Sequence, residues 1–253
     1  MLLKTIGMYI ILVKGEDRMS RITLIFITLI IMATFSITAL WFGFNGQSII
    51  EILNRLPQLF SPSNYVYLIW LVIFASLLIW LFKYRLELFH SSKQRVLMVW
   101  IAALQMTFFY VWHDELFIVA FVIAFIETLL IFALYNTFAL KAKPIQLRIP
   151  VALFLSWQIF MLLVDFSYIF VYFEWNGFGL SNALWVVIMM TVGTAAALHL
   201  RYHHADIGSP IVFILGYIGI AIKNGLDELL VSTAALFLCG VMIVGILFIK
   251  KNH

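Results

Sequence analysis

Long apolar runs separated by short polar connections account for most of the chain. The runs do not alternate polar and apolar residues as membrane β-barrel strands do, and most approach the length of about 20 residues that a membrane-spanning helix needs. The pattern therefore predicts an all-α integral membrane protein with about eight transmembrane helices, the seventh being the shortest. The predicted spans are residues 22–44, 64–84, 96–112, 116–139, 150–173, 182–200, 209–222 and 229–249.

A short amphipathic segment follows the first predicted span. Ser48 and Glu51 have the spacing of a capping box, in which each residue binds a backbone N–H at the start of a helix. Pro57 ends this helix, because proline lacks an N–H and disfavours a helical residue before it. The helix is too short to cross a bilayer, so we expect residues 45–63 to lie on the membrane surface or to cover a cavity as a lid.

Composition supports a membrane protein and argues against a soluble one. The chain is 64% hydrophobic and 11% charged, and its mean hydropathy is +1.07. A soluble domain of this length could not bury so much apolar surface, so lipid must surround most of it. The net charge of +4 does not indicate a nucleic-acid partner, because the basic residues lie between apolar runs instead of gathering on one element.

Basic and non-basic connections alternate along the chain. Cytoplasmic loops of membrane proteins are enriched in lysine and arginine, so this alternation predicts eight spans with both termini in the cytoplasm and the lid on the opposite face. The basic connections carry Lys4, Lys14, Arg18 and Arg21; Lys83, Arg85, Lys93 and Arg95; Lys141, Lys143 and Arg148; Arg201; and Lys250 and Lys251.

Two further features limit what the chain can do. Residues 1–21 form an N-terminal extension without a convincing signal-peptide cleavage site, and Met19 is an alternative start. Cys239 is the single cysteine and lies in the last apolar run, so we interpret it as a small buried hydrophobe that forms no intrachain disulfide.

Three polar residues fall at membrane depth, where they are energetically costly and so are candidates for function. Gln105 and Glu127 lie near the middle of the third and fourth spans, and Asp165 lies in the outer part of the fifth. Glu127 could carry a proton or pair with a cationic ligand, and Asp165 could accept a hydrogen bond from a ligand. The alternative is that each of them simply bonds to a neighbouring helix.

Catalytic and cofactor chemistry lacks support in the sequence. We find no nucleophile–base arrangement and no phosphate-binding glycine loop, so we expect no catalytic residues and no cofactor. His199 and His203 have helical spacing compatible with a metal, and Asp206 is nearby, but a solvated helix end explains them better. We therefore predict no metal site.

Four stretches, taken in order, resemble the tryptophan-rich sensory protein family, also called the translocator protein or peripheral benzodiazepine receptor family, and in particular its longer bacterial branch. The first contains NGQ, the Arg55-Leu-Pro57 turn, FSP and YVY before Trp70, and it is the most specific. The second ends in FFYVWHDE, the third is a proline-led helix, and the fourth is EWNGFGLSNALW. These stretches are residues 45–70, 105–115, 150–165 and 174–185.

The resemblance implies a five-helix core over residues 22–173, including the lid at 45–63, followed by a three-helix part over 174–253. It also implies a pocket for tetrapyrroles, sterol-like molecules or other planar apolar ligands. The chain departs from the family pattern at several of these positions: Gln105 and Asp165 replace asparagines, Met161 replaces a small residue, and a tryptophan is lost near Leu215. The residues that would line or support the pocket are Tyr65, Trp70, Gln105, Trp157 and Asp165.

The leading hypothesis is a non-enzymatic receptor or carrier for a planar hydrophobic small molecule in a bacterial cell membrane. A proton-coupled small-molecule transporter, with Glu127 or Asp165 as the titrating group, and a membrane scaffold without catalysis are the alternatives. A membrane enzyme acting on a lipid or porphyrin has no support from residues. Expected partners are membrane lipids and a porphyrin or similar ligand, with a homodimer left open and no nucleic acid.

Overall fold

The computed structural model describes residues 22–44, 46–88, 92–138 and 148–249, and within these ranges the chain forms helices and no β-strand. The predicted all-α class is therefore confirmed. Among the described residues, seven helices are long and apolar enough to cross a membrane. The seventh predicted span, residues 209–222, forms α8, which is apolar but has only 17 residues. At 1.5 Å per residue α8 is about 25 Å long, somewhat less than a hydrocarbon core of about 30 Å.

The observed helices agree closely with the predicted spans. The first span ends in a π-helical turn, η1, at Thr38–Phe42, and a short 3₁₀ helix, η2, at Asn64–Leu68 leads into the second. The spans are Ile22–Phe42, α3 (Ile69–Leu88), α4 (Ser92–His113), α5 (Phe117–Asn136), α6 (Ile149–Tyr172), α7 (Asn182–His204), α8 (Gly208–Asn224) and α9 (Leu229–Phe248).

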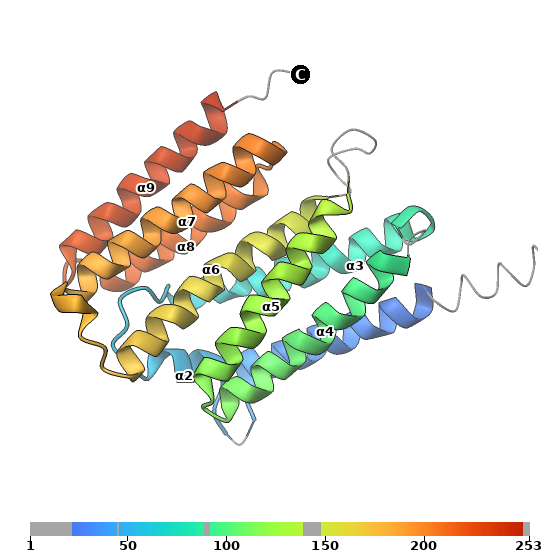
Figure 1. The fold of residues 1–253 in the computed structure, drawn as a ribbon, viewed down its shortest axis with the longest axis horizontal. Coiled ribbons are helices and arrows are strands. Elements are labelled where there is room, and N and C mark those ends of the chain that lie inside the picture. The colour runs from blue at the N-terminus through green and yellow to red at the C-terminus, as the bar shows by residue number, and fades with distance from the viewer. Residues whose placement is uncertain (1–21, 45, 89–91, 139–147, 250–253) are drawn as a thin grey trace, which may run out of the picture.

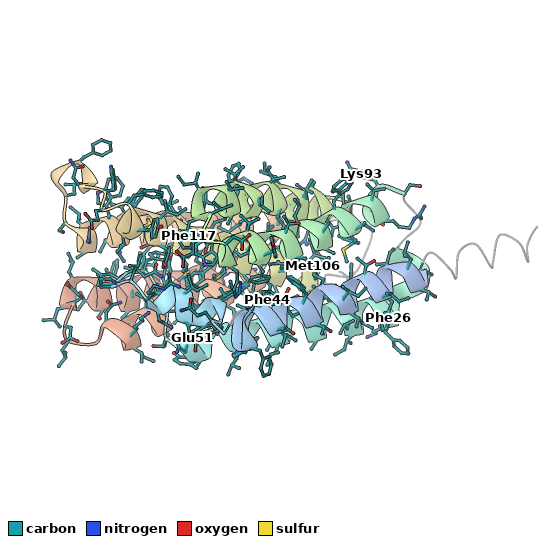
Figure 2. All side chains as sticks on the ribbon, turned by 90° about the horizontal axis from the view of Figure 1, so that it is seen from below. Phe26, Phe44, Glu51, Lys93, Met106 and Phe117 are labelled. Carbon is teal, nitrogen blue, oxygen red and sulfur yellow. The ribbon has the colours of Figure 1, made fainter. Side chains whose placement is uncertain are left out.

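Large apolar side chains cover the outside of the bundle. Ile79, Phe82, Trp100 and Phe237 are each more than half exposed to the surroundings. So many exposed apolar side chains would be unfavourable in water but suit a lipid environment. Figure 2 shows side chains projecting from the outer faces of the helices along the whole bundle. The protein is thus a multi-pass membrane protein.

Helix α6 lies at the centre of the arrangement. It is the most buried of the long spans: 67% of the residues in its most hydrophobic stretch of 18 are buried inside the protein. It packs against α3 and α5 on one side and against α7 and α8 on the other. Helices α7, α8 and α9 pack on one another, and Figure 1 shows them as a separate group beside α6. Whether the chain divides functionally at residue 173 remains a proposal.

The segment between the first span and η2, residues 46–63, is called the lid segment below. Its helix α2 (Ile49–Asn54) has the predicted capping box: the Ser48 Oγ accepts from Glu51 N, and the Glu51 carboxylate accepts from Ser48 N. A tight turn precedes it, where Gly43 has a φ of 72° and a Cβ would lie only 1.9 Å from the Gln47 carbonyl oxygen. Glycine is therefore required at position 43. The apolar face of α2 is buried against the bundle.

The C-terminal half of the lid segment is hydrogen-bonded to α8. Both the backbone N–H and the hydroxyl of Ser63 donate to the Gly219 carbonyl, each at 3.1 Å. The side chain of Asn224 donates to Leu59 O at 2.9 Å. The Lys223 ammonium donates to Asn54 Oδ1 at 2.8 Å. Helix α8, which belongs to the three-helix group α7–α9, thus holds the lid segment.

A polar cluster joins α5 to α8 at the far end of the bundle. Asp206 accepts from Gly208 N at 2.9 Å and from the Ser209 hydroxyl at 3.3 Å, which satisfies the start of α8. Tyr135 OH donates to the same carboxylate at 3.5 Å, and the Arg148 guanidinium lies 5.1 Å from the Tyr135 ring centroid. Burial raises the pKa of the Asp206 carboxyl, although these hydrogen bonds and the Arg148 charge offset part of the effect.

The predictions for the N-terminal extension, residues 1–21, fall outside the described residues. The same holds for the basic residues Lys141, Lys143, Lys250 and Lys251. In the part that is described, Arg148 and Asp206 lie at one end of the bundle, whereas the lid segment lies at the other with the α4–α5 turn. In Figure 2, Glu51 of the lid segment and Phe117 lie toward one end and Lys93 toward the other. Which end faces the cytoplasm stays a prediction.

Gly219→Ala should destabilise the protein by about 1–3 kcal/mol, because it overpacks the contact between α8 and the lid segment. A Cβ at this position would lie 2.3 Å from Val66 Cγ2 and 3.1 Å from Pro62 Cβ. Thermal unfolding in detergent measures the effect. Gly240→Ala in α9 is the matched control, since nothing lies within 4 Å of its Cβ position. An alanine there should be neutral or stabilising by up to about 1 kcal/mol. Equal effects of the two variants would contradict the close contact.

The stability of the protein should fall as the pH rises above the ordinary range of aspartate, about 4, because of Asp206. The Asp206 carboxyl binds its proton more tightly in the folded state than in the unfolded state, since burial raises its pKa. The contribution is therefore complete at low pH and is lost as the pH passes the folded-state pKa. Asp206→Asn should flatten this part of the curve of melting temperature against pH. A curve of unchanged shape in Asp206→Asn would contradict this assignment.

Candidate functional site

A buried cavity lies beneath the lid segment, between the first span, α3, α4 and α6. Its space amounts to about 320 Å³, including the narrow gaps between side chains. In this closed arrangement it admits a water-sized body, so a larger ligand would enter only after the lid segment moves. The lining residues are Leu40, Ile49, Trp70, Gln105, Phe108, Phe109, Trp112, Gln158, Met161 and Asp165.

Helical periodicity brings the lining residues of α4 onto one face. Phe108, Phe109 and Trp112 follow Gln105 by three, four and seven positions. This spacing places their side chains on the same side of the helix as Gln105. In α6, Gln158, Met161 and Asp165 follow the same rule. The two helices therefore present one polar–aromatic face each to the same space.

Aromatic rings form much of the wall. The rings of Trp70 and Phe109 meet edge to face, with centroids 6.1 Å apart. The Phe108 and Trp112 rings are 5.6 Å apart, and the Phe74 ring stacks on Trp70 at 5.2 Å. Such rings offer flat apolar faces for a planar ligand, and mutual packing holds them in place.

Polar atoms without hydrogen-bond partners concentrate at this cavity. Of the fourteen buried side-chain atoms of this kind found in the described part of the chain, seven belong to lining residues. Unpaired buried polar groups are rare in native proteins, and a cluster of them calls for a missing partner. The seven atoms are Trp70 Nε1, Gln105 Oε1 and Nε2, Trp112 Nε1, Gln158 Oε1, and both carboxyl oxygens of Asp165.

Glu127 lies behind the cavity and does not line it. Its side chain is fully buried on α5, and its Oε2 accepts from Gln158 Nε2 at 3.2 Å. The other carboxyl oxygen of Glu127 has no partner. Glu127 is thus connected to the cavity through Gln158, whose own Oε1 remains unpaired.

The structure brings together three of the five residues expected to bind a ligand, namely Trp70, Gln105 and Asp165. Trp157 is fully buried behind Trp70, with their ring planes nearly perpendicular at 6.1 Å, so it supports the wall without lining the cavity. Tyr65 is 44% exposed and is not among the residues that line the cavity. The buried Tyr67 contacts Trp157 instead, with centroids 6.3 Å apart. The ligand-binding roles stay predictions.

Sequence reasoning missed Trp112, Gln158 and the two phenylalanines of α4 as lining residues. Trp112 is fully buried and lines the cavity. The signal was present: Trp112 follows Gln105 by seven residues, and Gln158 precedes Asp165 by seven. Applying helical periodicity from each suspected polar residue would have found both.

A set of contacts holds the lid segment to the turn between α4 and α5. Arg55 and Glu115 form an ion pair at 2.5 Å, and Arg55 also donates to Gln47 Oε1 at 2.7 Å. The carboxylate beside it raises the pKa of the Arg55 guanidinium further. The Nε2 of His113 lies 2.8 Å from Gln47 O and 3.2 Å from Phe44 N, so either tautomer joins α4 to this backbone.

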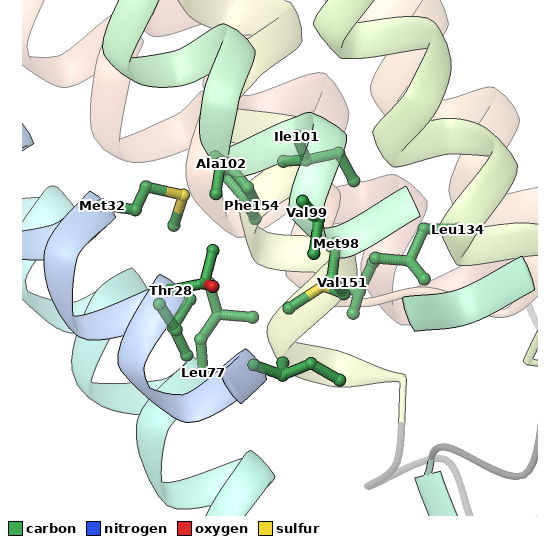
Figure 3. Close-up of a pocket in the computed structure, with 12 residues that line it drawn as sticks. Thr28, Met32, Leu77, Met98, Val99, Ile101, Ala102, Leu134, Val151 and Phe154 are labelled. Atoms are coloured by element: carbon green, nitrogen blue, oxygen red, sulfur yellow. The ribbon is translucent and has the colours of Figure 1, made fainter. Parts of the chain in front are cut away.

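Two other cavities differ from this one in chemistry. A larger space of about 400 Å³ lies between the first span, α3, α4, α5 and α6, and it is lined by other residues of these helices (Figure 3). Thr28 carries the only polar side chain that lines it, and its hydroxyl already donates to Leu24 O. This cavity therefore lacks groups to orient a ligand. The other, about 340 Å³, lies between the lid segment, α6 and α7, where Trp175 and Trp185 pack 5.0 Å apart.

Possible metal ligands do not gather in the part of the chain that the structure describes. No group of three or more histidine, cysteine or acidic side chains there could hold a metal ion. The rings of His199 and His203 lie 4.3 Å apart. Asp206 is directed instead toward Gly208 and Ser209, as described above.

Comparison with known families gives one match that covers most of the chain. The family model described as TSPO-like protein matches residues 22–248. No curated protein and no solved structure matches the chain.

Arg55→Ala should loosen the lid segment with little effect on global stability. The Arg55–Glu115 pair is about two-fifths exposed, and exposed pairs contribute at most about 1 kcal/mol. Hydrogen exchange of residues 46–63 should therefore accelerate by up to about fivefold. Arg95→Ala, at the other end of α4, is the control and should leave this exchange unchanged. Unaltered exchange in Arg55→Ala would show that the ion pair does not hold the lid segment.

Proposed function

The chain belongs to the TSPO-like protein family, and from that premise we propose that it binds a planar hydrophobic small molecule in the cavity beneath the lid segment, as a membrane receptor or carrier. The family membership confirms the resemblance drawn from the sequence. The ligand would be tetrapyrrole-like or sterol-like in size and apolarity. The family match covers the whole described chain except residue 249.

The unpaired polar atoms are the observation that carries this proposal. A protein that only needed to be stable would gain by replacing Gln105 with an apolar residue, because an unpaired buried amide costs about 1–3 kcal/mol. The cost is understandable if a ligand supplies the missing partners. Gln105 offers an acceptor oxygen and an amide nitrogen with two N–H donors, and the indole N–H groups of Trp70 and Trp112 offer two more donors.

The aromatic wall favours a flat ligand. Rings of Trp70, Phe108, Phe109 and Trp112 surround the polar groups. Binding pockets for small molecules typically combine such apolar walls with a few placed polar groups. Met161 stands where the family pattern has a small residue, and its side chain occupies part of the space. The cavity therefore suits a narrower ligand than it would with a small residue there.

The scaffold alternative explains less. A bundle that served only to hold other proteins would not need unpaired polar groups around an internal space. It would also not need a capped and doubly anchored segment over that space. Carrier and receptor share the same binding step, so the binding experiment comes first.

Gln105→Leu should weaken ligand binding by about tenfold while leaving the protein equally stable or more stable. The substitution removes two unpaired polar atoms and keeps a side chain of similar size. Binding of protoporphyrin IX to the purified protein can be followed by quenching of its tryptophan fluorescence, and stability by thermal unfolding.

Ser36→Ala is the matched control for this pair of effects. Ser36 also has a buried hydroxyl without a partner, but it does not line the cavity. We expect it to preserve stability and affinity together. A Gln105→Leu protein that is less stable and binds normally would mean that the amide is structural, and absence of saturable quenching in the unaltered protein would reject the proposed function.

A further inference from the structure

The cavity contains an acid but no base. Asp165 is 1% exposed and lines the cavity, and neither of its carboxyl oxygens has a hydrogen-bond partner. None of the ten lining residues is basic. An ionised carboxylate without a partner is strongly unfavourable at membrane depth. Something must therefore balance its charge: a proton when the cavity is empty, or a cation when it is filled.

The elements packed around Asp165 supply no positive charge among the described residues. From η2, the Tyr67 phenol interacts electrostatically with Asp165. From α5, the Glu127 carboxyl reaches the cavity through Gln158. Tyr168 follows on the same helix, and α4 presents the uncharged Gln105. The first span and α2 contribute only apolar side chains to the lining.

The nearest basic side chains on the lid side already have other partners. Arg55 pairs with Glu115 outside the cavity. Lys223 donates to Asn54 on the exposed side of α2. His113 is engaged with the backbone near Gln47. None of these side chains lines the cavity.

We propose that the ligand is a planar apolar cation, and that its binding displaces one proton from Asp165. This rests on the proposed function and specifies the class of ligand for the same cavity. In the empty cavity the Asp165 carboxyl holds the proton. When the cation enters, the O–H bond breaks, the proton leaves to water past the open lid segment, and the carboxylate pairs with the cation. The cavity is electrically neutral before and after the exchange.

Asp165, and not Glu127, is the exchanging group. Both Asp165 oxygens face no protein partner, whereas one Glu127 oxygen already accepts from Gln158 and the residue does not line the cavity. The walls suit a cation as well. The faces of Trp70, Phe108 and Trp112 can each attract a positive charge, and this attraction is strongest where water is excluded.

A matched pair of probes tests the inference. N-methyl-4-phenylpyridinium is an aromatic cation whose charge does not depend on pH, and 4-methylbiphenyl is a neutral molecule of the same shape. Binding of both to the purified full-length protein can be followed by tryptophan fluorescence between about pH 5 and pH 9. Calorimetry of the cation in buffers of different ionisation enthalpy counts the protons released.

The cation should bind more tightly as the pH rises, by up to about tenfold per pH unit while Asp165 still holds its proton. About one proton should be released for each cation bound, and 4-methylbiphenyl should bind independently of pH. Asp165→Asn should abolish the pH dependence and the proton release but preserve binding of 4-methylbiphenyl, which also reports correct folding. Glu127→Gln is the control and should retain the proton release.

The outcomes separate this inference from the proposed function. Equal binding of the two probes without proton release would overturn the cation exchange and leave the binding function intact. Binding of neither probe would overturn the cation exchange, and the binding function would be rejected as well only if protoporphyrin IX also gave no saturable quenching. The calorimetric proton count on the unaltered protein tests whether cation binding releases a proton, and it does so even if Asp165→Asn does not fold.

Discussion

Lipid as the surrounding solvent is the constraint on which the rest of this structure depends. Hydrocarbon offers no hydrogen bonds, so each spanning segment must satisfy its own backbone, and helices do so. The same absence makes every polar side chain at depth costly unless it has a partner inside the protein. The helical bundle follows from the first consequence. The second makes Gln105 and Asp165 informative, because their side chains have no such partner.

The position of α6 explains how one cavity gathers groups from so many elements. This helix packs against both groups of helices and is largely enclosed. Its polar residues Gln158 and Asp165 therefore cannot turn toward lipid headgroups or water. They face α4, whose own polar and aromatic face lies opposite, and the capped helix α2 covers the space between them. The site is a product of helix periodicity on two facing helices.

Much of the fold follows from sequence alone because a hydrophobic span has few alternatives. The boundaries of the eight helices agree with the apolar runs, and the capping box at Ser48 and Glu51 formed as its spacing indicated. The site was harder to predict. Trp70, Gln105 and Asp165 line the cavity, but Tyr65 points elsewhere and Trp112 lines it unexpectedly. Position along a span gives the depth of a side chain, whereas its direction around the helix depends on the neighbours that the helix packs against.

All ten residues that line the cavity lie between Leu40 and Asp165, yet part of what holds its cover lies far downstream. Leu59, Ser63 and Asn54 are bound by residues of α8. A chain truncated after Tyr172 would keep every wall of the cavity but lose these three attachments. Helix α8 therefore binds the segment that covers the cavity without contributing a wall to it, so a substitution in α8 would act on the cover and leave the walls unchanged.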